Sequence, residues 1–152
     1  MTRPSTRSST PGSLIRRHLA IGWWSILLFS ALGLLLELLH GFKIAAYLDV
    51  GNETRRLMWT LAHAHGTLLG LIHIAFAATL GAVTTFSPEQ QRTISKTLVA
   101  ATIVLPGGFF AAGIRFYSGD PGIAAAVVPV GAALLLLAVW LIARNLGQSK
   151  DL

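Results

Sequence analysis

The sequence contains no cysteine, and only 12% of its 152 residues are charged. Without cysteine there can be no disulfide, no thiolate metal site, no covalently attached c-type haem and no cysteine nucleophile. Hydrophobic residues make up 53% of the chain, and the mean hydropathy is +0.65. This composition excludes a disordered chain and argues against a water-soluble globule. The sequence also lacks a P-loop, a GxSxG elbow and an HExxH motif, so it carries no signature of nucleotide binding or hydrolysis.

Four long apolar runs are present instead. About 20 apolar residues cross the roughly 30 Å hydrocarbon layer as a helix. The runs are continuously apolar, whereas strands of a membrane barrel would alternate apolar and polar residues. We therefore predict an all-α fold, a four-helix transmembrane bundle over residues 14–143. Its helices are expected at about 19–40, 57–86, 94–117 and 122–143, between a disordered cytoplasmic tail at 1–13 and a second tail at 144–152.

The first apolar run, 19–39, follows basic residues, a pattern that also fits a cleaved signal peptide. It is longer than the apolar region of a signal, and it ends in Glu37-Leu-Leu-His40 rather than in a small-residue cleavage site. A retained transmembrane helix that stops at Gly41 is the prediction.

The distribution of Lys and Arg predicts the sidedness of the chain. One side carries eight of these residues, in or next to the terminal segments and the second loop: Arg3, Arg7, Arg16, Arg17, Arg92, Lys96, Arg144 and Lys150. The other side carries four: Lys43, Arg55, Arg56 and Arg115. Because cytoplasmic segments are enriched in Lys and Arg, both termini are expected in the cytoplasm of a bacterial inner membrane. The net charge of +6 then reports topology and contact with the lipid bilayer rather than nucleic-acid binding.

Local signals mark helix ends and breaks. Ser87-Pro88-Glu89-Gln90 predicts a helix start with a capping box. Residues 119–122, Gly-Asp-Pro-Gly, predict a tight turn. Pro106 and Pro129 each free a backbone carbonyl one turn earlier, that of Thr102 and that of Ala125. These breaks either open a small cavity or only kink the helices.

Two polar residues share the last turn of the first run. Glu37 and His40 lie at i and i+3, and Glu-x-x-His is the spacing that helical bundles use in carboxylate-bridged metal sites. Joined by His63 from the next helix, they would give three ligands suited to a single Fe, Zn or Cu ion. The structural alternatives are that His40 contacts the last carbonyls of its own helix, and that Glu37 pairs with Arg115 or Arg55.

The second run has a packing face of small residues. Six residues recur there at spacings of three and four: His63, Gly66, Gly70, His73, Ala77 and Gly81. This spacing allows close helix approach and turns both histidines of the stripe toward protein. His65 lies about 200° round the helix from His63, so the two cannot easily chelate one ion by themselves. A hydrated state near the interface is the alternative for both. For His73, near the middle of the membrane, a hydrogen bond across helices is expected, with haem ligation as the alternative.

Residues 62–70 read AHAHGTLLG. This segment resembles the His-x-His segment of haem-copper oxidase catalytic subunits, in which one of its histidines binds the low-spin haem. The resemblance implies that His63 or His65 ligates a haem b, with Arg115 near the propionates. The copper-site histidine cluster of that family is absent. Together with PGGFFAAG at 106–113, the segment is also similar to small bacterial four-helix membrane proteins without an assigned activity.

The sequence leaves three classes of function open. The first is a haem- or metal-binding module with ligands in the outer half of the bundle. The second is a structural or accessory subunit of a membrane complex or homo-oligomer, in which the polar groups only stabilise. The third is a small proton or ion transporter that uses Glu37 and the histidines as titrating groups. An enzyme acting on a large substrate is not expected, because so few polar residues are available.

Overall fold

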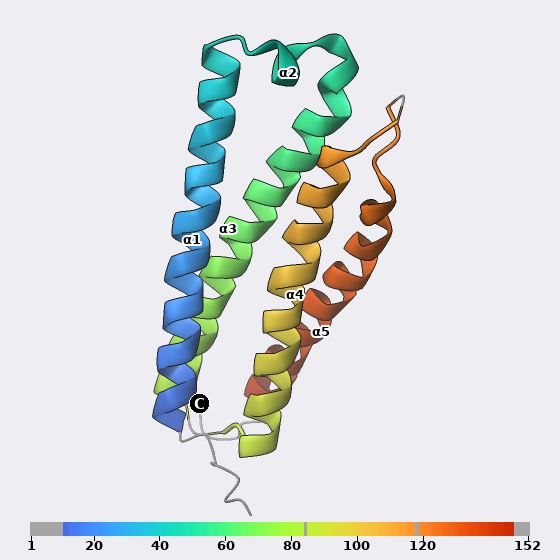
Figure 1. The fold of residues 1–152 in the computed structure, drawn as a ribbon. Helices are drawn as coiled ribbons and strands as arrows, with labels where there is room; N and C mark the ends of the chain where they lie inside the picture. The colour runs from blue at the N-terminus through green and yellow to red at the C-terminus, as the bar shows by residue number, and fades with distance from the viewer. Residues whose placement is uncertain (1–10, 84, 118, 148–152) are drawn as a thin grey trace, which may run out of the picture.

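The computed structural model describes residues 11–83, 85–117 and 119–147, and over these ranges the chain is helical with no strand beyond an isolated bridge between Tyr117 and Asp120 (Figure 1). Each of the four expected apolar runs contains a helix long and apolar enough to cross a membrane. The long helices are α1 (Pro11–Gly41), α3 (Glu53–Ala82), α4 (Pro88–Ile114) and α5 (Val128–Gly147). Short helical segments connect them: α2 (Ala45–Leu48), η1 (Val50–Asn52) and η2 (Ile123–Val127).

The helix boundaries differ from the expected ones where polar residues continue a helix. Helix α1 begins at Pro11, eight residues before the expected start, so the polar residues ahead of the apolar run continue the same helix. Helix α5 begins at Val128 rather than at 122, and a 3-10 segment precedes it. Pro129 is therefore the second residue of α5, where no intrahelical N–H bond is lost, and it starts the helix instead of interrupting it. Residues 1–10 and 148–152 of the expected tails lie outside the described residues.

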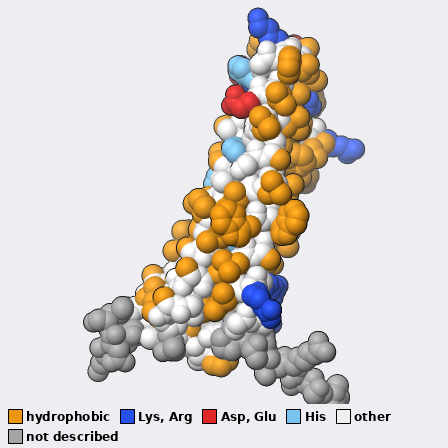
Figure 2. Space-filling model, turned by 90° about the vertical axis from the view of Figure 1, so that its left-hand side faces the viewer, with side chains coloured by type: hydrophobic (Ala, Val, Ile, Leu, Met, Phe, Trp, Pro, Cys, Tyr) orange, Lys and Arg blue, Asp and Glu red, His pale blue; other side chains and the backbone are white. Residues whose placement is uncertain are grey.

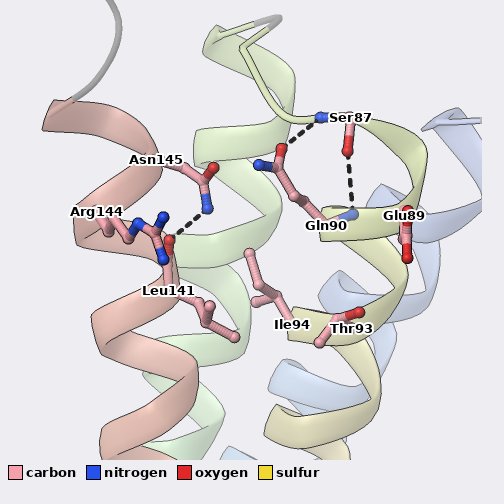
Figure 3. A pocket seen from close by; sticks show the side chains of 8 residues that line it. All are labelled: Ser87, Glu89, Gln90, Thr93, Ile94, Leu141, Arg144 and Asn145. Carbon is pink, nitrogen blue, oxygen red and sulfur yellow. Dashed lines mark hydrogen bonds between the residues drawn. The ribbon is translucent and has the colours of Figure 1, made fainter.

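The predicted capping box at the start of α4 is confirmed. The Ser87 side chain accepts a hydrogen bond from the Gln90 backbone N–H, and the Gln90 side chain accepts one from the Ser87 backbone N–H (Figure 3). Helix α1 ends at Gly41 as expected, although the residue with positive φ is Lys43, at 54°. Gly119, with φ of 89°, provides the turn between α4 and η2.

The four long helices form an open row rather than a bundle closed around one core. Helix α1 packs on α3, α3 on α4 and α4 on α5, while α1 touches α4 only lightly (Figure 1). The main hydrophobic cluster lies between α3, α4 and α5 and includes Leu69, Phe76, Phe86, Ile94, Leu98, Ala101, Leu105 and Ala138. Helices α1 and α5 lie at the two edges of the row, and most of their residues are exposed.

Glycines bring α1 and α3 into backbone contact. A Cβ atom at Gly70 would lie 2.9 Å from the Gly22 carbonyl oxygen, and one at Gly22 would lie 2.8 Å from the Gly70 carbonyl oxygen. Gly66 faces the Phe29 ring, and Gly33 faces the His63 ring. The predicted small-residue face of α3 is therefore the surface on which α1 packs, except for Gly81, which is exposed. Such close approach is typical of helix pairs that associate in lipid.

The surface has the charge distribution of a membrane-spanning chain. Figure 2 shows the side on which α1 lies, with hydrophobic side chains along its length and Lys and Arg side chains toward the ends. Large apolar residues of α1, among them Trp23, Trp24 and Leu28, are more than half exposed. In water such a surface would be unstable, whereas lipid tails would cover it without cost.

Candidate functional site

Two histidines meet in the interior of the row. The Nδ1 atoms of His18 on α1 and His73 on α3 are 2.6 Å apart, and the two rings stack with their centroids 4.8 Å apart. Both residues are fully buried, and the Phe76 ring packs edge-on against His18. The glycine contact fixes this geometry, because Gly22 lies one turn after His18 and Gly70 lies one turn before His73. The predicted hydrogen bond of His73 across helices is thus confirmed.

Two hydroxyl groups of α4 extend the histidine pair at both ends. The Ser95 Oγ lies 2.8 Å from Nε2 of His18, and the Thr102 Oγ1 lies 2.9 Å from Nε2 of His73. Ser95 is buried, and Thr102 is half-buried. All four ring nitrogens of the pair therefore have a partner. We call the set Ser95, His18, His73 and Thr102 the histidine relay.

The hydrogen bonds of the relay assign a direction to it. The Thr102 hydroxyl donates to the Leu98 carbonyl oxygen over 2.9 Å, so it accepts from Nε2–H of His73. In a neutral ring Nδ1 of His73 is then an acceptor, and Nδ1–H of His18 donates to it. This leaves Nε2 of His18 to accept from the Ser95 hydroxyl. Every donor in the set points from Ser95 toward Thr102.

The relay connects two hollows on opposite sides of it. Ser95 also lines a pocket of about 260 Å³ at the start of α1 and α4, which contains Arg17, Arg92 and Lys96 and no carboxylate. We call it the basic pocket. Thr102, at the other end of the relay, lines a groove of about 490 Å³ between α1 and α4. This lateral groove is walled mostly by apolar side chains, with Ser25 and Thr102 as its hydroxyl-bearing residues.

A third hollow lies toward the outer end of α1. Glu37, His40 and His63 all line a pocket of about 390 Å³, together with Tyr47 and Thr60. We call it the outer pocket. The structure thus brings the three predicted metal ligands to one pocket, with Glu37 and His40 exposed. Among the described residues, however, no three His, Asp or Glu side chains are close enough together to hold a metal ion.

The other predicted ligands are separated from one another. Nδ1 of His63 is 2.6 Å from the Phe29 carbonyl oxygen of α1, whereas Nδ1 of His65 is 2.8 Å from the Leu61 carbonyl oxygen of its own helix. The two histidines therefore point to different neighbours, as their angular separation predicts. Arg115 lines a surface pocket in the loop after α4. The alternative in which Glu37 pairs with Arg115 or Arg55 is not found: the one ion pair among the described residues joins Arg56 to Glu53.

The sequence pointed to His73 and missed its partner. His18 follows Arg16 and Arg17 directly and precedes the first apolar run, so its place in the sequence is that of the polar flank of a helix. The signal was present in the helical periodicity, because His18, Gly22, Ser25 and Phe29 recur at spacings of three and four. That stripe is the face of α1 that packs on α3 and lines the lateral groove.

A polar pocket of about 380 Å³ lies beside the capping box, between the start of α4 and the end of α5 (Figure 3). Its amide groups are engaged within the chain: Gln90 closes the capping box, and the Asn145 side chain donates to the Leu141 carbonyl oxygen. This pocket is therefore part of the helix ends rather than a second site.

No family model, no curated protein and no solved structure matches the chain.

Proposed function

We propose that the protein is a small proton transporter of the bacterial inner membrane, with both termini in the cytoplasm. The observation that carries this proposal is the histidine relay, a chain of four exchangeable groups with two fully buried histidines at its centre, which joins a basic pocket to a groove. Buried ionisable residues within membrane-spanning segments are costly, and they commonly mark ion pathways and proton relays. Histidine suits such a path because its two ring nitrogens can take up a proton on one side and release one on the other.

Three stations follow one another along α1. Next to the basic pocket, His18 and Ser95 form the inner end of the path. The lateral groove lies in the middle, and Thr102 connects the two, because it ends the relay and also lines the groove. Beyond it lies the outer pocket with its titratable side chains, Glu37 among them. His63 of the outer pocket contacts the Phe29 carbonyl, and Phe29 also lines the groove, so the second and third stations share a wall.

The proposed orientation and surroundings follow from charge and exposure. The count of eight Lys and Arg in the terminal segments and the second loop against four on the other side fits a cytoplasmic face for the end where α1 and α4 begin and α5 ends (Figure 1). The exposed apolar faces of α1 and α5 would contact the lipid bilayer, or other chains if the protein works as a homo-oligomer or as part of a larger membrane complex.

Proton flux into liposomes tests the proposal. The purified protein is reconstituted with a pH-sensitive dye inside, and a potassium gradient with valinomycin drives proton entry. We expect flux above that of empty liposomes, and we expect His73→Asn to reduce it at least tenfold, because the amide cannot shuttle a proton between two atoms. His65→Asn is the matched control, since His65 bonds to its own helix and lies outside the relay.

A folded His73→Asn variant with wild-type flux would overturn the proposal. If that variant fails to fold, Ser95→Ala removes the inner hydroxyl of the relay and should also lower the flux. Glu37→Gln tests the outer station separately, because loss of its carboxylate should lower the flux while leaving the relay intact.

A second candidate function, a metal or haem module, is favoured by one observation: Glu37, His40 and His63 line a single pocket. A side-chain rearrangement there would be needed to form a ligand set for a single Fe, Cu or Zn ion. Elemental analysis of protein purified in mild detergent tests this candidate, with His63→Ala compared against His65→Ala. Near-stoichiometric metal that His63→Ala removes and His65→Ala retains would support it, and metal retained in His63→Ala would place the ion elsewhere.

A further inference from the structure

The lateral groove contains polar groups that the chain itself leaves without partners. Ser25 is 9% exposed and lines the groove, and its hydroxyl has no hydrogen-bond partner among the described residues. Other hydroxyls within these helices, those of Thr67, Thr79 and Thr102, bond to the carbonyl four residues earlier. Ser25 makes no such bond. The other helix hydroxyls without a hydrogen-bond partner among the described residues, those of Ser30, Thr60, Thr93 and Thr97, are exposed or half-exposed, whereas Ser25 is buried near the middle of α1, where hydrocarbon cannot satisfy a hydroxyl.

A backbone carbonyl in the same groove also lacks its usual donor. Pro106 lies inside α4 and has no N–H, so the Thr102 carbonyl loses the hydrogen bond that an α-helix would give it. Thr102 and Pro106 both line the groove. Residues that line the groove therefore supply one carbonyl without the donor of a regular helix and one hydroxyl that can donate or accept.

The walls of the groove favour an uncharged ring. Phe29 comes from α1 and Phe110 from α4, with Leu28, Leu32 and Ile103 completing the lining. Ser25 lies about 20 Å along α1 from either end of the helix, far from the headgroup layer. A charged headgroup cannot reach that depth cheaply, so the polar atom of the occupant must be neutral. The volume of about 490 Å³ lies within the range of small-molecule sites.

We propose that the lateral groove binds a neutral, lipid-soluble aromatic alcohol of the phenol or quinol class. Its hydroxyl group donates to the Thr102 carbonyl oxygen and accepts from the Ser25 hydroxyl, while its ring packs between Phe29 and Phe110. Such a molecule enters from the lipid, because the groove lies between two helices that touch only lightly. The binding depends on the groove alone and not on proton movement through the relay.

Trp59 provides a reporter beside the groove. Its ring stacks on Phe110 with the two centroids 5.6 Å apart. The other three tryptophans, Trp23, Trp24 and Trp140, are more than half exposed and can be replaced by Phe. The probe is 4-bromophenol, which is uncharged at pH 7 and carries a bromine that quenches tryptophan at short range. Bromobenzene, which lacks the hydroxyl, is the matched probe.

We expect saturable quenching of Trp59 by 4-bromophenol in detergent without any proton gradient. Ser25→Ala should weaken the apparent affinity for 4-bromophenol about fivefold, the effect of one hydrogen bond, and leave that for bromobenzene unchanged. Gly107→Leu should abolish saturable binding, because Gly107 lines the groove and a Cβ there meets no atom within 4 Å, so the new side chain has room to occupy the groove. Gly81→Leu is the control, since Gly81 is equally open and lies outside the groove.

Quenching that rises linearly with both probes, as for simple partitioning, would overturn the inference. So would saturable quenching that Gly107→Leu leaves unchanged. If Ser25→Ala weakened the affinity for both probes equally, the proposed hydrogen bond between Ser25 and the hydroxyl of the bound molecule would be wrong. His73→Asn, which tests the relay, should leave the quenching intact, so failure of binding and failure of proton transport are separate results.

Discussion

The contact between Gly22 and Gly70 makes a sharp prediction for Gly70→Ala. The added Cβ would lie 2.8 Å from Cγ1 of Ile26, 2.9 Å from the Gly22 carbonyl oxygen and 3.1 Å from the Ile26 backbone nitrogen. Two of these three atoms belong to the backbone, so no side-chain rotation can relieve the overlap. Reaching an ordinary contact of 3.4 Å requires α1 to move away from α3 by about 0.5 Å at this point.

The cost of that movement can be separated from helix propensity. Overpacking of a fitted interface costs about 1–3 kcal/mol, whereas Gly→Ala in a helix gains up to about 1 kcal/mol. Gly81→Ala, on the same helix with no atom within 4 Å, receives the propensity gain alone. The difference between the two variants is therefore the overpacking cost, and 2 kcal/mol would correspond to about 4–8 °C in the midpoint of thermal unfolding.

Thermal unfolding in a mild detergent, followed by circular dichroism, measures the difference. Gly22→Ala should behave like Gly70→Ala, because its Cβ would meet the Gly70 carbonyl oxygen at 2.8 Å. Gly66→Ala should cost at least as much, since the added Cβ overlaps Cγ of Phe29, which turning the ring in its own plane cannot move, so the whole side chain must leave its place between α1 and α3. Equal midpoints for Gly70→Ala and Gly81→Ala would refute the helix contact on which the position of the relay depends.

Three further predictions concern single groups. Ser87→Ala should lower the free energy of unfolding by about 1 kcal/mol through loss of the helix cap, measured by the same thermal unfolding; Ser87→Asp should preserve most of the stability. Ser95→Ala should cost about 1–3 kcal/mol, because it leaves Nε2 of His18 buried without a donor; a neutral result would remove that hydrogen bond from the account. Pro106→Ala should restore a donor to the Thr102 carbonyl and weaken 4-bromophenol binding, measured by Trp59 quenching; unchanged affinity would contradict the role of that carbonyl.

The four helices and the capped start of α4 could be predicted because their sequence signals are local. Apolar runs set the four spans, and the Ser87–Gln90 pair sets one helix start through neighbours three residues apart. The angular argument for His63 and His65 also depends on one helix alone. The prediction that Pro129 interrupts a helix is wrong, because a proline in an apolar run fits either the interior or the first turn of a helix. The 3-10 segment before α5 places Pro129 in the first turn.

The relay and the open row could not be predicted in the same way. Which helices touch depends on surfaces far apart in the sequence, and His18 and His73 are separated by 55 positions. An apolar run contains no information on whether its outer face meets lipid or another helix. The sequence therefore predicts that His73 needs a hydrogen-bond partner but not which residue provides it. The packing of α1 on α3 identifies that partner as His18.

The uniform direction of the hydrogen bonds in the relay limits how quickly one proton can follow another along it. A proton that enters at Ser95 and leaves at Thr102 converts both imidazoles to the opposite tautomer, so the whole chain then points backward. Another proton can follow only after the rings rotate or the bonds rearrange. With both rings fully buried and stacked, rotation needs the surrounding helices to loosen. We therefore expect slow, stepwise proton transport whose rate is limited by movement of the helices. This rate should lie far below the proton flux of an open water-filled channel.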